Sequence, residues 1–156
     1  MNEVNVPAGA LVLVGDGRKA LFLRNTGTPR HVDLVTERVL EQSNPPTRAQ
    51  GTDRPGRYLG PDGASRSAME ETDWHQLAEE RFAEEIAEAL YRRAHTQGFE
   101  DLVIVAPPKV LGNLRAAFHK EVSARVRAEL PKDLTRHPVR EIARHLALRE
   151  DAESRP

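Results

Sequence analysis

The sequence supplies side chains for three kinds of chemistry: hydroxyl nucleophiles, metal ligands and cations that bind phosphate. Ser65 and Ser67 are the candidate nucleophiles, each in combination with a histidine. Neither serine has the Gly-x-Ser-x-Gly spacing that places a nucleophile on a sharp turn between a strand and a helix. A serine-dependent hydrolase is therefore the least favoured function. The absence of cysteine from the sequence excludes thiol nucleophiles, disulfides and iron–sulfur clusters.

The six histidines and the acidic residues do not form a recognisable metal site. No two histidines have the His-x-x-x-His spacing that places two ligands on one helical face. Residues 102–106 are entirely apolar, whereas two-metal nucleases need carboxylates on adjacent central strands. Asp101 precedes this run, at the end opposite to the one where α/β sheets bind ligands. We therefore expect no metal ion and no other cofactor.

Charge is distributed unevenly along the chain, although 23 basic and 24 acidic residues almost cancel. The stretch 70–88 is rich in glutamate, whereas the stretch 109–149 contains ten basic residues and four acidic ones. Two interpretations fit this asymmetry equally well. The basic part could bind RNA or another phosphate-bearing partner, or it could pair with the acidic part of the same molecule.

Residues 41–72 have little apolar content and are interrupted by glycine and proline, which predicts a long flexible loop. Loops of this length are usually functional or disordered. The segment combines basic and aromatic side chains, so it could bind a phosphate backbone: Arg48, Arg54, Arg57, Tyr58 and Arg66. Plain disorder explains its composition equally well.

The rest of the chain predicts a single α/β domain over residues 1–150, followed by a disordered tail at residues 151–156. The expected order is β-β-β-loop-α-β-α-β-α, with a mixed sheet of about five strands. The strands are expected near residues 10–14, 20–23, 31–40, 102–106 and 126–130, and the helices from Asp73 to Gly98, after Pro107-Pro108 and from Pro138.

Local signals sharpen this prediction. Asp16-Gly17 predicts the tight turn of a hairpin, and a slip in the alternation near Thr36 predicts a bulge in a half-buried third strand. Asp73 and Gln76 form a capping pattern at the expected start of the long helix. The apolar run 102–106 predicts a parallel strand that is covered on both faces, at the centre of the sheet.

The apolar runs are far too short to span a bilayer, and the first residues lack the basic and apolar regions of a signal peptide. We therefore expect a soluble cytoplasmic protein without a membrane span.

The order of elements and several motifs resemble the bacterial host attachment protein family. The motifs are Leu102-Val103-Ile104-Val105-Ala106-Pro107-Pro108, Leu111-Gly112-x-Leu114-Arg115, Phe118-His119-Lys120 and Glu129-Leu130-Pro131-Lys132-Asp133-Leu134-Thr135. The domain of this family is similar to the middle domain of archaeal and eukaryotic class I peptide release factors. That similarity implies a ribonuclease H-like topology, and it implies fold more firmly than function.

In the release factors that this chain resembles, the loop before the long helix carries Gly-Gly-Gln, which acts on peptidyl-tRNA. The loop 41–72 has no Gly-Gly-Gln, so no catalytic residue carries over. The resemblance still implies contact with ribosomal RNA, tRNA or the ribosome. The candidate residues for this contact are Arg54, Arg57, Arg66, Lys109, Arg115 and Lys120.

The leading hypothesis is therefore a non-enzymatic module that binds RNA or the ribosome. The alternative is a protein-interaction module required for attachment to host cells, which would have a protein partner. A hydrolase that uses Ser65 or Ser67 is the third hypothesis.

Overall fold

A five-stranded mixed sheet forms the centre of the molecule. The computed structural model describes residues 5–42, 61–96 and 98–147, with only the backbone for residues 61–72. Its strands are β1 (Leu11–Gly15), β2 (Lys19–Asn25), β3 (Leu34–Glu41), β4 (Leu102–Val105) and β5 (Val126–Leu130). The sheet order is β3-β2-β1-β4-β5. β1, β4 and β5 are parallel, and β2 is antiparallel to both β1 and β3. This order confirms the predicted α/β class and agrees with the expected ribonuclease H-like topology.

β1 and β2 form the predicted hairpin around Asp16-Gly17. The Asp16 carboxylate accepts hydrogen bonds from the backbone N–H groups of Arg18 and Lys19, each at 2.8 Å. The backbone N–H of Asp16 also donates to the carbonyl of Lys19 at 2.9 Å. An aspartate at this position therefore closes the turn with its own side chain.

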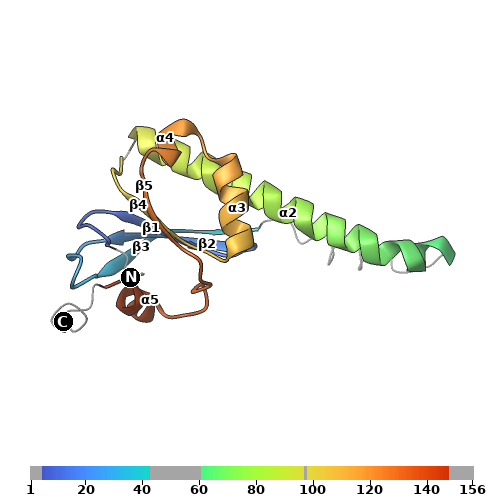
Figure 1. The fold of residues 1–156 in the computed structure, drawn as a ribbon, viewed down its shortest axis with the longest axis horizontal. Helices are drawn as coiled ribbons and strands as arrows, with labels where there is room; N and C mark the ends of the chain where they lie inside the picture. The colour runs from blue at the N-terminus through green and yellow to red at the C-terminus, as the bar shows by residue number, and fades with distance from the viewer. Residues whose placement is uncertain (1–4, 43–60, 97, 148–156) are drawn as a thin grey trace, which may run out of the picture.

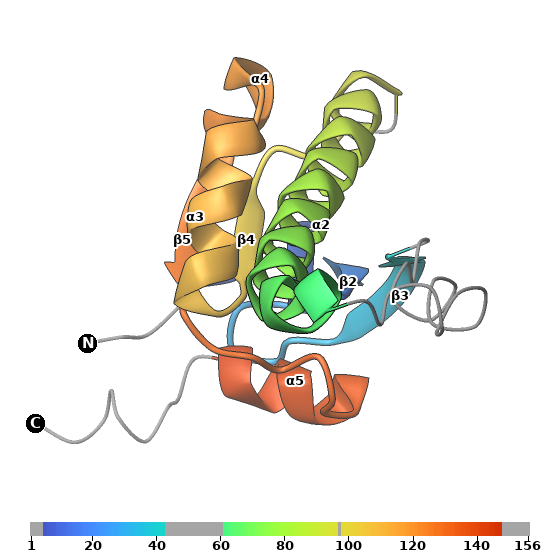
Figure 2. The same ribbon diagram turned by 90° about the vertical axis from the view of Figure 1, so that its right-hand side faces the viewer.

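β3 contains the predicted bulge but is more exposed than predicted. Phe22 pairs with Arg38 and Leu23 pairs with Thr36, which leaves Glu37 as the extra residue. Leu34 is the one buried residue of the strand, and Val35 and Val39 are 47% and 45% exposed. The prediction of a half-buried strand was wrong because β3 lies at the edge of the sheet, where the helices cover little of it (Figure 2).

The bulged Glu37 binds two arginines that connect β3 to its neighbours. Its carboxylate accepts a hydrogen bond from Arg24 Nε of β2 at 3.2 Å and one from Arg93 Nη1 at 2.5 Å. Burial alone would raise the pKa of the Glu37 carboxyl. The hydrogen bonds and positive charges of the two arginines outweigh this effect, so its pKa lies below the ordinary value.

The long helix α2 (Pro61–Thr96) begins twelve residues earlier than predicted. Residues 61–72, which were assigned to the loop, are helical, and Asp73 is an interior residue instead of a cap. Residues 43–60 of the predicted loop lie outside the described residues. The early start fits Pro61, since proline is favoured in the first helical turn, but Asp62-Gly63 imitates a turn signal. The predicted end is confirmed, because Gly98 has φ +74° and its N–H donates to the carbonyl of Arg93.

Helices cover both faces of the sheet (Figures 1 and 2). α2, α3 (Pro108–Ala117) and the short α4 (Lys120–Ser123) lie on one face, and α5 (Val139–Leu146) lies on the other. Pro107 and Pro138 directly precede α3 and α5, as expected for residues whose restricted backbone favours a helix start.

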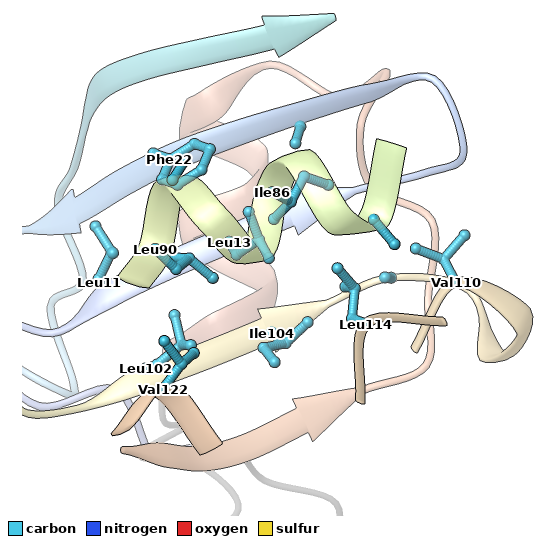
Figure 3. Packing of buried hydrophobic residues seen from close by; sticks show 14 of the residues in the cluster. Leu11, Leu13, Phe22, Ile86, Leu90, Leu102, Ile104, Val110, Leu114 and Val122 are labelled. Atoms are coloured by element: carbon cyan, nitrogen blue, oxygen red, sulfur yellow. The ribbon is translucent and has the colours of Figure 1, made fainter. Parts of the chain in front are cut away.

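Two hydrophobic clusters fill the spaces between the sheet and the helices. Leu13 and Ile104 face α2 and α3, where they pack with Ile86, Leu90 and Leu114 (Figure 3). Alternate strand residues, including Val12, Val14, Val103 and Val105, face α5 and pack against Ile142 and Leu146. Because both faces are covered, β1 and β4 are apolar at every position, which confirms the prediction for residues 102–106.

A buried asparagine connects the segment before β1 to the turn between β2 and β3. Asn25 is completely buried, and its amide donates to the carbonyl of Val6 at 3.0 Å. Its side-chain oxygen accepts from the N–H groups of Gly27 at 2.8 Å and Asp33 at 3.0 Å. Gly27 is required for this turn, since a Cβ there would lie 2.1 Å from the carbonyl oxygen of His31.

Candidate functional site at the carboxyl ends of the parallel strands

The carboxyl ends of β1, β4 and β5 lie on the same side of the sheet, together with the end of β3. We call this border, which is formed by strand ends and not by an outer strand, the carboxyl edge. The N-terminal part of α2 extends beyond this same edge, to the right in Figure 1. In α/β sheets this is the end where the loops after the strands build ligand sites. It is therefore the first place to look for functional side chains.

Thr135 joins two acidic residues at this edge. Its side-chain oxygen lies 2.9 Å from Asp16 Oδ2 and 2.8 Å from Asp133 Oδ1, and the residue is 6% exposed. Its backbone N–H also donates to Asp133 Oδ1 at 3.1 Å. One hydroxyl proton can be donated to only one carboxylate at a time, so Thr135 can exchange between the two partners. The contact fastens the segment after β5 to the β1–β2 hairpin.

The start of α3 offers donors for an anion. Its N-cap is Pro107, which makes no capping hydrogen bond, and the first turn contains no acidic residue. The partial positive charge of a helix N-terminus is therefore not neutralised by a side chain of the helix itself. Lys109 in this turn lies 4.0 Å from Glu79 of α2, a distance at which the ion pair is loose.

Glu79 packs against the hairpin and positions α2 over this edge. A Cβ at Gly17 would lie 2.8 Å from the Glu79 carboxylate, so the glycine permits this close approach. Gln42 at the end of β3 donates from its side chain to the carbonyl of Gly17 at 3.0 Å. α2, β3 and the hairpin therefore meet at one point of the edge.

Three exposed cations surround this edge without an ion pair in the described part of the chain. Arg18 belongs to the hairpin, and Lys132 and Arg136 follow β5. Their exposure leaves their charges available to a ligand, whereas the carboxylates of Asp16 and Asp133 are already hydrogen-bonded.

The predicted phosphate-binding residues are not brought together. Lys109 lies at the start of α3, Arg115 in its last turn and Lys120 at the start of α4. Arg115 donates to Glu129 of β5 through two nitrogens, at 3.1 and 2.5 Å, and this pairing raises the pKa of the guanidinium. Arg54 and Arg57 lie outside the described residues. Arg66 belongs to α2, where only the backbone is described, and not to a loop.

The charge asymmetry along the chain is resolved partly by pairing. Arg115 pairs with Glu129 and Arg127 with Asp101, so some cations pair with strand ends and not with the acidic helix. Among the described residues, Lys109–Glu79 and His119–Glu88 are the ion pairs that residues 109–149 form with that helix, and Arg125 also donates to the carbonyl of Ala94. No ion pair within the described residues involves Lys132, Arg136, Arg140 or Arg144.

The predicted Ser65 nucleophile and its neighbour Ser67 lie in the part of α2 where only the backbone is described. Within the described residues, no group of three or more histidine or acidic side chains could hold a metal ion. No helix in the described ranges has the length and hydropathy that a membrane span requires.

Sequence reasoning did not identify Thr135 or the unpaired arginines of α5. Thr135 is the last residue of a motif that carries the family resemblance, and it follows the predicted strand 126–130, so it lies near the carboxyl end of a parallel strand. Arg140 and Arg144 form no ion pair with a described residue, and the sequence does not signal this, because the partners of other arginines come from distant parts of the chain.

Comparison with known families identifies this arrangement of strands and helices. The model of the bacterial archaeo-eukaryotic release factor family 12 matches residues 9–146. A comparison with curated proteins gives no match. Because the family match includes every strand and helix described above, the chain belongs to bacterial archaeo-eukaryotic release factor family 12.

Proposed function

We propose that the protein is a non-enzymatic module that associates with the ribosome through RNA phosphates at the carboxyl edge of its sheet. The observation that carries this proposal is the release factor family match over residues 9–146. Release factors work on the ribosome, where most of the accessible negative charge comes from the RNA backbone.

The geometry of the edge supports a phosphate contact. The N-terminus of α3 is uncapped by a side chain, and Lys109 stands beside it. Arg18, Lys132 and Arg136 add exposed positive charge around the same edge. Cations and helix N-termini that contact phosphates position a protein on RNA without reading its sequence.

Peptide release is not part of the proposal. Release by the factors that this chain resembles depends on Gly-Gly-Gln before the long helix, and the nearest approximations in residues 41–72 are Gln50-Gly51 and Gly60-x-x-Gly63. We therefore expect purified protein to leave peptidyl-tRNA intact in a ribosomal release assay.

Sedimentation of tagged protein from cell lysate at low and high salt tests the association. We expect co-migration with ribosomal particles at low salt and release at high salt, because phosphate contacts weaken steeply with salt. Protein that stays at the top of the gradient at every salt concentration would contradict the proposal.

Matched variants locate the contact. Arg18→Gln/Lys132→Gln/Arg136→Gln removes three unpaired cations at the edge and should abolish co-migration. Arg92→Gln/Arg115→Gln/Arg127→Gln removes three cations that pair with Glu88, Glu129 and Asp101, and it should co-migrate like the wild type. Arg54→Ala/Arg57→Ala/Arg66→Ala tests the sequence-predicted residues separately. If the first two variants lost co-migration to the same extent, the association would depend only on the total charge of the protein.

A second candidate function is a protein-interaction module for attachment to host cells. It is favoured by a cavity of about 170 Å³ beside α2, lined by residues that include Trp74, Leu77 and Phe82. Leu77 is 43% exposed, and the indole N–H of Trp74 is buried without a hydrogen-bond partner among the described residues. Cell fractionation tests this function, since it requires a substantial pool of protein at the cell surface.

A further inference from the structure

A groove of about 510 Å³ lies on the face of the sheet opposite to α2, α3 and α4. One wall is α5, and the other is the connection between β2 and β3, residues 30–34. Figure 2 shows α5 on this side of the sheet, opposite to α2 and α3. The groove is separate from the start of α3, where the phosphate contact of the proposed function is placed.

The lining of the groove is aliphatic and its rim is basic. Val32, Leu34, Val139 and Ala143 contribute apolar surface. Arg140 and Arg144 stand one helical turn apart on α5, and both are exposed. Residues four apart on a helix are neighbours on the same face, so the two guanidinium groups form one positive strip along the groove.

The positive strip is not neutralised by the groove itself. Neither Arg140 nor Arg144 forms an ion pair within the described part of the chain, although arginines elsewhere in this protein do. Asp33, on the opposite wall, is the one acidic side chain among the described residues that line the groove. The charge of the groove therefore complements an acidic ligand.

The apolar lining decides which class of acidic ligand fits. Sites for single-stranded RNA usually contain aromatic side chains on which bases stack, and the described lining residues include no phenylalanine, tyrosine or tryptophan. Aliphatic surface beside guanidinium groups instead matches a segment with apolar side chains on one side and carboxylates along its margin. Arginine is also enriched in protein interfaces, where its planar group binds carboxylates through two hydrogen bonds.

We propose that the groove between α5 and residues 30–34 is a docking site for an acidic amphipathic segment of a partner protein. The partner's apolar side chains contact Val32, Val139 and the neighbouring aliphatic residues. Its carboxylates bind Arg140 and Arg144. This site is independent of the RNA contact proposed above.

NMR titration of the full chain tests the site, because it detects binding as weak as millimolar. The probe is a synthetic peptide of about four helical turns, with leucines on one face and glutamates on both margins. The comparison ligands are a peptide of the same composition in shuffled order and an oligouridine of similar net charge. We expect the amide signals of residues 30–34 and 139–147 to shift with the amphipathic peptide, and to shift far less with the two comparison ligands.

Two matched double variants separate local from general charge. Arg140→Gln/Arg144→Gln should weaken binding of the amphipathic peptide by about tenfold or more, as for central arginines of an interface. Arg115→Gln/Arg127→Gln removes the same charge from residues that are already paired and should bind like the wild type. Val139→Ser tests the apolar lining and should weaken the peptide without changing any binding of oligouridine.

Several results would overturn the proposal. The first two are that the shuffled peptide binds as tightly as the amphipathic one, and that the two double variants lose the same affinity for the amphipathic peptide. The other two are that oligouridine shifts the NMR signals of the groove residues at a lower concentration than the peptide does, and that millimolar peptide leaves these signals unchanged. The ribosome association of the proposed function is measured in a separate experiment. Ribosome co-migration of the Arg140→Gln/Arg144→Gln variant should equal that of the wild type whether or not the groove binds the peptide.

Discussion

The arginines of α3 and β5 pair with carboxylates, whereas those of α5 form no ion pair with any described residue. Arg115 and Arg127 each pair with an acidic residue that a strand or its flank contributes. Arg140 and Arg144 line a groove in which Asp33 is the one acidic side chain among the described lining residues. The ten basic residues of the C-terminal third are therefore not equivalent, and a count of charges along the sequence cannot separate those that pair from those that remain available to a ligand.

The two faces of the sheet differ in their cover as well as in their charge. Three helices, one of them 36 residues long, cover the first face, whereas an eight-residue helix covers the second. We expect the first face to contribute more to global stability. The second face should open more easily, because a short terminal helix has fewer buried contacts to hold it.

Core truncations on the two faces should show this difference most strongly. Ile104 of β4 and Ile142 of α5 are both completely buried. We expect Ile104→Ala to cost about 3 to 5 kcal/mol of unfolding free energy and Ile142→Ala about 2 kcal/mol, since α5 can relax around the cavity. Chemical denaturation measures both values. A larger loss of unfolding free energy in Ile142→Ala than in Ile104→Ala would show that the second face contributes more to stability.

The buried Asn25 should be the most important polar residue on the α5 side. Asn25→Ala leaves the backbone N–H groups of Gly27 and Asp33 without their acceptor, which should cost about 1 to 3 kcal/mol. Hydrogen exchange should then increase first around residues 25–33. Unchanged hydrogen exchange in residues 25–33 would show that water replaces the side-chain oxygen of Asn25 as the acceptor.

Glu37 should make the stability of the first face depend on pH. The pKa of Glu37 is lower in the folded protein, so its stabilising effect is complete above the unfolded-state value of 4.5 and is lost as the pH falls through the folded value. Glu37→Gln should therefore destabilise the protein by about 0.5 to 1 kcal/mol at neutral pH. In thermal melts, the difference in melting temperature between Glu37→Gln and the wild type should disappear below pH 4.5.

The smallest effects concern the surface arginines. Arg140→Gln/Arg144→Gln should change stability by less than about 0.5 kcal/mol, because these exposed side chains form no ion pair with any described residue. Arg115→Gln/Arg127→Gln should lower the melting temperature slightly at low salt, and the difference should fade at high salt as the ion pairs are screened. A stabilising effect of the paired arginines that is independent of salt would contradict this interpretation.

The sequence predicts those elements whose signals are local. The hairpin around Asp16, the bulge near Thr36, the apolar strand 102–106 and the helix end at Gly98 all follow from neighbouring residues. The start of α2 at Pro61 does not, because the helix there extends beyond the sheet and needs no apolar stripe. The exposure of β3 also depends on where the helices lie, which no local pattern contains.

The candidate sites were harder to predict because they depend on contacts between distant residues. Thr135 and Asp16 are 119 positions apart in the sequence. Lys109, Arg115 and Lys120 are close in sequence, yet the helices point them to different neighbours. The predicted Arg54 and Arg57 remain predictions for the ribosome contact.

The extra residue in β3 has a consequence for the protein at high concentration. An edge strand with a regular row of backbone donors and acceptors can serve as a template for a strand of another molecule. Glu37 interrupts that row halfway along β3 and adds a charge held by Arg24 and Arg93. Although Val35 and Val39 are exposed, this kink should keep neighbouring molecules from joining their sheets, which protects the protein from aggregation as it accumulates in a cell.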